Sequence, residues 1–140
     1  MRVLCVCLGN ICRSPAAEAA LRARGVDADS AGTGGWHIGK PPYTPMQNAG
    51  RELGRDMSDL RARQFTVADF YDFDLILAMD DDNRADIERL RPAGNDTPVQ
   101  LFADGPVPDP YYTRDFDGAW AMIEAAADDL ISRKVVVSAG

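Results

Sequence analysis

Near the start of the chain the sequence reads Cys7-Leu8-Gly9-Asn10-Ile11-Cys12-Arg13-Ser14-Pro15. A short apolar run over residues 3–7 leads into this stretch, and an alanine-rich helical pattern follows it. A strand, a tight loop and the start of a helix form the arrangement in which backbone N–H groups converge on an anion. Gly9 and Asn10 can adopt the left-handed conformations that such a loop requires. The stretch therefore predicts an anion-binding loop between a buried strand and a helix.

The residues after the loop are typical of a helix N-terminus. Ser14 is a good N-cap, and Pro15 suits the first helical position. The carboxylate of Glu18 complements the positive end of the helix dipole. We therefore expect a helix over about residues 14–24, ended by Gly25.

Cys7 and Arg13 are the candidate reactive groups of the loop, with five residues between them. The guanidinium of Arg13 offers a planar fork of donors that matches phosphate oxygens. Cys7 faces the N–H groups of the loop, and we expect them to hold it as a thiolate at neutral pH. A nucleophile beneath a cradle for an oxyanion indicates a site that cleaves phosphate esters.

Other interpretations of the loop remain open at this point. Cys7 could be an ordinary cysteine buried in a strand, with no reactive role. The loop could also bind the phosphate of a nucleotide without catalysing a reaction. However, no Lys-Ser/Thr pair follows the glycine, so the Walker pattern is absent. The chain has one histidine, His37, and no Cys-x-x-Cys pair, so we expect no metal and no other cofactor. Cys7 and Cys12 are close enough in sequence to form a reversible disulfide, which we treat as a hypothesis.

The length of the chain predicts one domain over residues 1–140. Its residues are 46% apolar and 26% charged, which is typical of globular proteins. The net charge of −7 argues against a nucleic-acid-binding or membrane-surface protein. It does not exclude an anionic substrate, because the local field of the loop decides binding there. With no basic-then-apolar leader before residue 3, we expect a cytoplasmic protein, although export by an unusual route stays open.

Strand and helix patterns alternate along the whole chain. We therefore predict an α/β fold, a single three-layer domain with a four-stranded parallel sheet and helices on both faces. The ligand of such a sheet lies at the carboxyl ends of the strands, where the phosphate-binding loop follows the first strand. The expected strands are residues 3–7, 28–33, 75–79 and 99–102.

The string over residues 7–15, placed after a short N-terminal strand, closely resembles the signature of the low-molecular-weight protein tyrosine phosphatases. Further stretches are similar to that family, so that the likeness spans nearly the whole chain. They are Ser-Ala-Gly-Thr-x-x-Trp-x-x-Gly at 30–39, Ala-Arg-Gln at 62–64, Met-Asp-x-x-Asn at 79–83 and Asp-Pro-Tyr-Tyr at 109–112. In the third of these, Asp80 is expected to support the phosphate-binding loop.

The resemblance also selects a general acid. By composition, residues 103–115 are a turn-rich surface loop, and no spacing rule distinguishes Asp109 from Asp104 or Asp115. The resemblance implies that Asp109 protonates the leaving oxygen. It also implies a pocket whose walls are Trp36, Tyr111 and Tyr112.

The activity that the resemblance implies is metal-independent hydrolysis of phosphotyrosine, and of small aryl phosphates, through a cysteinyl-phosphate intermediate. Its catalytic residues are Cys7, Arg13 and Asp109. Ser14 is expected to donate a hydrogen bond to Cys7, and Asn10 to hold the loop shape. The expected partners are phosphotyrosine-containing proteins, and the chain is expected to be a monomer or to self-associate weakly. The phosphate-binding loop comprises Leu8, Gly9, Asn10, Ile11, Cys12 and Ser14.

The sequence departs from the family pattern at Leu60, where some members have a histidine that supports the loop. A protein-arginine phosphatase is the nearest alternative, but such relatives tend to carry threonine where this chain has Ile11. An arsenate reductase would need further cysteines after Cys12, and none is present. A non-catalytic phosphate-binding module is disfavoured, because both Cys7 and Asp109 are present.

Overall fold

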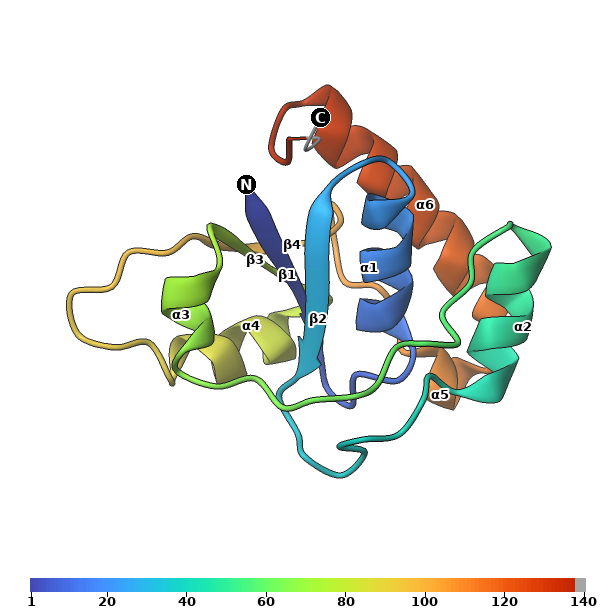
Figure 1. The fold of residues 1–140 in the computed structure, drawn as a ribbon, viewed down its shortest axis with the longest axis horizontal. Helices are drawn as coiled ribbons and strands as arrows, with labels where there is room; N and C mark the ends of the chain where they lie inside the picture. Colours follow the sequence, from blue (N-terminus) through green and yellow to red (C-terminus); the bar gives the residue numbers. More distant parts are fainter. Residues whose placement is uncertain (138–140) are drawn as a thin grey trace.

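The computed structural model describes residues 1–137, which form an α/β sandwich around one sheet (Figure 1). Four parallel strands lie in the order β2-β1-β3-β4. The strands are β1 (Arg2–Cys7), β2 (Asp27–Gly32), β3 (Leu75–Ala78) and β4 (Val99–Leu101). The helices are α1 (Arg13–Arg22), α2 (Thr44–Glu52), α3 (Asp69–Asp72), α4 (Asp81–Glu88), α5 (Pro110–Thr113) and α6 (Phe116–Ser132).

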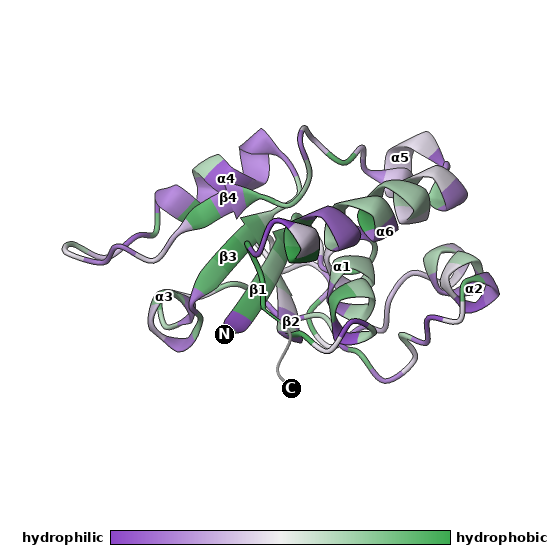
Figure 2. Cartoon of the chain, turned by 90° about the horizontal axis from the view of Figure 1, so that it is seen from above, coloured by the Kyte–Doolittle hydropathy of each residue, from purple (hydrophilic) through white to green (hydrophobic). Residues whose placement is uncertain are grey.

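Helices cover both faces of the sheet, which confirms the predicted three-layer arrangement. Val3 and Cys5 of β1 belong to the core under α1 and α6, whereas Leu4 and Val6 belong to the core under α3 and α4. Strands buried on both faces explain the continuous apolar run of β1. Figure 2 shows β1 and β3 as a hydrophobic centre with hydrophilic stretches on the outer helices. No helix within residues 1–137 is long and apolar enough to span a bilayer.

The strand order places the loop after β1 at a topological switch point. From β1 the chain passes through α1 to β2 on one side, and the later strands β3 and β4 add on the other side. In open parallel sheets the crevice at such a point, beyond the carboxyl ends of the strands, is where ligands bind. The loop over residues 8–12 lies in that position.

The predicted start of the first helix is wrong by one residue. Helix α1 begins at Arg13, and its N-cap Cys12 makes no side-chain capping bond. The buried Ser14 hydroxyl lies against Cys7 and Asn10 instead of capping the helix. Tertiary hydrogen bonds have thus outweighed the local preference of serine for the N-cap.

Trp120 joins the last helix to the rest of the core. Its side chain is fully buried, and its indole N–H donates to the carbonyl of Met46 in α2 at 3.0 Å. The ring lies against the backbone of Gly50, where an added Cβ would come within 2.6 Å of Cζ2. Helix α2 can therefore pack on α6 only because residue 50 has no side chain.

We predict that Gly50→Ala destabilises the fold by about 1–2 kcal/mol. Overpacking costs about 1–3 kcal/mol, and the better helix propensity of alanine returns up to about 1 kcal/mol. Urea unfolding followed by far-UV circular dichroism measures the difference. Gly105→Ala is the matched control, because no atom lies within 4 Å of its added Cβ. Equal stabilities for the two variants would contradict this account of the α2–α6 packing.

Candidate active site

The loop after β1 is held tightly against the end of β2. The N–H of Thr33 donates to the carbonyl of Cys7 at 2.9 Å, and that of Gly34 donates to the carbonyl of Leu8 at the same distance. A Cβ on Gly32 would lie 2.8 Å from the Leu8 carbonyl oxygen. The loop can take this course because Asn10 adopts a left-handed backbone with φ of 57°.

Two donors reach the sulfur of Cys7, which is 3% exposed at the end of β1. The backbone N–H of Asn10 lies 3.3 Å from Sγ, and the hydroxyl oxygen of Ser14 lies 3.0 Å from it. The side-chain amide of Asn10 donates to Ser14 Oγ at 2.8 Å. The hydroxyl proton of Ser14 is therefore available to the Cys7 sulfur or to the carbonyl of Ala31, which lies 3.3 Å away.

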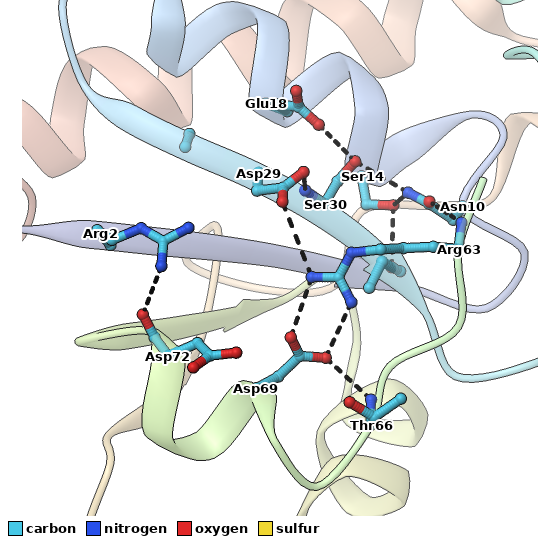
Figure 3. A network of polar contacts seen from close by, with 12 residues as sticks. Arg2, Asn10, Ser14, Glu18, Asp29, Ser30, Arg63, Thr66, Asp69 and Asp72 are labelled. Atoms are coloured by element: carbon cyan, nitrogen blue, oxygen red, sulfur yellow. Dashed lines mark hydrogen bonds and ion pairs between the residues drawn. The ribbon is translucent and has the colours of Figure 1, made fainter. Parts of the chain in front are cut away.

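A polar network behind the loop fixes the side chain of Asn10 (Figure 3). Its amide nitrogen also donates to Ser30 Oγ at 3.0 Å, and its oxygen accepts the backbone N–H of Arg63 at 3.0 Å. The Ser30 hydroxyl in turn donates to Glu18 at 2.7 Å. The guanidinium of Arg63 makes two 3.0 Å bonds to Asp69. The left-handed residue is thus anchored to β2, α1 and the segment before α3.

The expectation that Glu18 complements the helix dipole is wrong, because the first turn of α1 holds no acidic residue and Glu18 lies beyond it. Its side chain is 2% exposed, and burial raises the pKa of the carboxyl group. The hydrogen bond from Ser30 and the ion pair with Arg22, at 2.8 Å, act in the opposite direction without cancelling this effect. Glu18 is therefore a structural support beneath the loop, a role that helix-end reasoning from sequence missed.

Arg13 is a buried cation with three acceptors. Its Nη1 donates to Asp80 at 2.7 Å and to the carbonyl of Val107 at 3.0 Å, and Nη2 lies 3.4 Å from Asp109 Oδ2. Burial alone would lower the pKa of Arg13, but the charge of Cys7 and the two carboxylates raise it. Asp80, expected to support the loop, does so by holding this guanidinium.

Among the three aspartates of the 103–115 loop, the structure brings one to the site. Asp109 is the N-cap of α5, where Oδ1 accepts the N–H of Tyr111 at 3.0 Å while Oδ2 faces Arg13. Asp104 is exposed, and Asp115 caps α6 through the N–H of Gly118. The short helix α5 was not predicted from the sequence, yet it is what orients Asp109.

A cavity of about 300 Å³ opens over the loop. Trp36 and Tyr112 stand at its mouth and are 69% and 73% exposed, and Tyr111 packs on Tyr43 with ring centroids 5.2 Å apart. The cavity brings together the residues of the predicted site other than the buried Asn10 and Ser14, which support the loop from behind. Its lining is Cys7, Leu8, Gly9, Ile11, Cys12, Arg13, Trp36, His37, Asp109, Tyr111 and Tyr112.

His37 is the lining residue that sequence reasoning missed. Its ring lies over the phosphate-binding loop, where a Cβ on Gly9 would come within 3.0 Å of Cδ2. Its position next to Trp36 in the wall loop is the one signal that would have placed it there.

The three cysteines are free thiols in different surroundings. Burial raises the pKa of Cys12 to about 12, and the charge of Cys7 adds to this effect. Burial likewise raises the pKa of Cys5, which lies in the core. The Cys7–Cys12 disulfide stays a prediction. Within residues 1–137, no three His, Cys, Asp or Glu side chains are grouped as they would be to hold a metal ion.

A parallel sheet with a Cys-x5-Arg loop at its switch point, faced by an aspartate, defines a cysteine-dependent phosphatase. Comparison with known proteins agrees. The family model described as low molecular weight phosphotyrosine protein phosphatase matches residues 2–137, and the chain belongs to that family.

Three similar proteins each cover at least 93% of the chain. The low molecular weight protein-tyrosine-phosphatase YfkJ of Bacillus subtilis is 39% identical over an alignment of 145 positions, which covers 93% of this chain and 93% of the relative. A protein tyrosine phosphatase structure from Entamoeba histolytica superposes with a TM-score of 0.87 at 34% identity, covering 96% of this chain and 97% of the other. A structure named as a Drosophila arginine phosphatase has a TM-score of 0.88 at 30% identity, covering 96% and 98%.

We predict that Cys12 resists alkylation at neutral pH. In the Cys7→Ser variant the charge of Cys7 is absent, but burial still raises the pKa of Cys12, so iodoacetamide at pH 7.5 should react at least about 10-fold more slowly than with a free thiol. Mass spectrometry of the folded variant measures the rate. The same variant unfolded in urea is the control and should take two groups. Labelling of Cys12 in the folded protein at the unfolded rate would contradict the assigned environment.

Proposed function

We propose that this chain hydrolyses phosphotyrosine in proteins, and small aryl phosphates, through a cysteinyl-phosphate intermediate and without a metal. The observation that carries the proposal is the convergence of three groups on one cavity: the Cys7 sulfur, the Arg13 guanidinium and the Asp109 carboxylate. The match of the family model to residues 2–137 supports a single phosphatase domain.

The cavity suits a phosphorylated aromatic ring. Ile11 and Leu8 supply apolar surface near the loop, and Trp36, Tyr111 and Tyr112 supply aromatic walls at the mouth. The phosphate would lie over the loop residues, with Arg13 bidentate on its oxygens. The 3.4 Å contact between Arg13 Nη2 and Asp109 is long, so Nη2 can turn to a phosphate oxygen at little cost.

In the first step the Cys7 thiolate attacks phosphorus in line with the tyrosine oxygen. The S–P bond forms as the P–O bond breaks, and Asp109 gives its proton to the departing phenolate, which leaves as a phenol. The N–H of Tyr111 holds Asp109 Oδ1, and Oδ2 lies toward Arg13 and the cavity. This geometry supports Asp109 as the general acid.

In the second step a water molecule attacks the cysteinyl-phosphate, and Asp109 takes its proton. The S–P bond breaks, and the electron pair returns to sulfur as thiolate while inorganic phosphate leaves. Ser14, 3.0 Å from the sulfur, stabilises the thiolate that is set free. The loop donors and Arg13 stabilise charge on the equatorial oxygens in both transition states, because they are oriented before the substrate arrives.

Ile11 favours phosphotyrosine over phosphoarginine. It lines the cavity and is buried, so it offers a substrate ring an apolar contact and offers a guanidinium no hydrogen bond. Hydrolysis of phosphoarginine is the alternative activity, because a similar structure is named as a Drosophila arginine phosphatase. The cytoplasmic location, and the expectation of a monomer or of weak self-association, stay predictions from the sequence.

We predict that the native protein hydrolyses para-nitrophenyl phosphate in the presence of EDTA. Cys7→Ser should abolish turnover. Asp109→Asn should lower kcat by about 10²–10⁴-fold, the usual range for general acid catalysis. Asp104→Asn is the matched control, since it removes an exposed carboxylate from the same loop, and it should retain native turnover.

No turnover by the folded, reduced native protein would overturn the proposed function. Full activity in Asp109→Asn would overturn the role of that residue alone. Peptides of one sequence carrying phosphotyrosine or phosphoarginine then decide the substrate, and we expect the phosphotyrosine peptide to be hydrolysed faster.

A further inference from the structure

A second cavity, of about 450 Å³, opens beside the phosphate pocket along α4. The two cavities share Leu8, Arg13, Asp109 and Tyr112. An extended peptide advances about 3.3–3.6 Å per residue, so a neighbour of a bound phosphotyrosine can reach this second cavity with its side chain. We call it the α4 groove, and its other lining residues are Asp80, Asp82, Asn83, Ala85, Asp86 and Arg89.

The α4 groove is acidic, and one of its carboxylates has no partner among the described residues. Asp80 holds Arg13, and Asp86 is paired with Arg89. Asp82 is exposed and makes no hydrogen bond or ion pair within residues 1–137. It stands in the first turn of α4, where it complements the helix dipole, but its neighbour Asp81 does the same without lining the groove.

Asn83 gives an independent sign that the groove takes a ligand. Its side chain is 2% exposed and lines the groove, and its Oδ1 has no hydrogen-bond partner among the described residues. Buried amide oxygens are normally matched by a donor. The carboxylates around the groove accept hydrogen bonds but cannot supply one, and its two guanidiniums, Arg13 and Arg89, are paired with Asp80 and Asp86. A bound molecule can supply the donor that Asn83 Oδ1 lacks.

We propose that the α4 groove binds the side chain of a lysine or arginine that lies close to the phosphotyrosine of a protein substrate. Asp82 supplies the opposite charge, and Asn83 Oδ1 accepts one N–H of the ammonium or guanidinium. Asp80 and Asp86 add to the negative field, which disfavours an acidic side chain at the same place. This inference rests on the proposed phosphotyrosine hydrolysis and adds to it a preference for basic flanking residues.

The test uses phosphotyrosine peptides with alanine at the flanking positions and a single lysine, alanine or glutamate at −2, −1, +1 or +2. For at least one position, we expect lysine to raise kcat/KM about threefold to fivefold over alanine, because a partly exposed ion pair contributes only a modest free energy. Glutamate at that position should lower kcat/KM. The lysine preference should shrink as sodium chloride is added, because salt screens the pair.

Two variants with the same change in charge locate the effect. In Asp82→Asn the ratio of kcat/KM for the lysine and alanine peptides should fall toward one, whereas in Asp81→Asn it should stay at the native value. Because each ratio is taken within one variant, any shared change in the chemical step cancels. Asp82→Lys should reverse the preference in favour of glutamate, a gain that loss of folding cannot imitate.

The outcomes separate this inference from the function beneath it. A native protein that hydrolyses neither para-nitrophenyl phosphate nor any phosphotyrosine peptide overturns the proposed function, and the groove with it. A native protein that hydrolyses the lysine, alanine and glutamate peptides equally well overturns the groove alone. A lysine preference that survives in Asp82→Asn also overturns it.

Discussion

The left-handed backbone of Asn10 is the constraint on which the site depends. An L-residue in this conformation costs about 1–2 kcal/mol. The side-chain amide of Asn10 offsets this cost by donating two hydrogen bonds and accepting a third. Those bonds reach Ser14, Ser30 and the backbone of Arg63, so the loop shape is tied to three separate segments of the fold. The loop is therefore shaped before any phosphate arrives, and its donors need no reorganisation when charge develops on the phosphate.

Arg13 shows the same preorganisation in electrostatic form. A cation buried this deeply is stable only when acceptors surround it, and Asp80, Asp109 and the Val107 carbonyl provide them. Asp80 and Val107 hold one end of the guanidinium, while the other end makes, among residues 1–137, only the long contact to Asp109. One half of the fork is thus fixed, and the other half is free to turn to a substrate. The same contact brings the proposed acid next to the proposed phosphate site.

The sequence predicted the fold well because strands and helices alternate and each strand is short, apolar and bounded. It predicted the loop because all its residues are consecutive. Asp109 was beyond any spacing rule, because the contact that brings it to the site is with Arg13, far away in the chain, and the family resemblance alone selected it. Ser14 was wrongly predicted as an N-cap and Glu18 as a partner of the helix dipole, because tertiary hydrogen bonds outweighed local helix preferences. The cavity position of His37 and the unmatched oxygen of Asn83 arise from packing between distant segments, which no local pattern encodes.

The central claim is that Cys7 carries the phosphoryl group between the two steps. Acid quench of the native protein during turnover of a phosphotyrosine peptide, followed by proteolysis and mass spectrometry, tests it most directly. The account predicts one added phosphoryl group on the peptide that contains Cys7, and none on the corresponding peptide of Cys7→Ser. Turnover with the phosphoryl group on another residue, or an early-time quench that traps no phosphoenzyme while phosphate is released at the native rate, would contradict it.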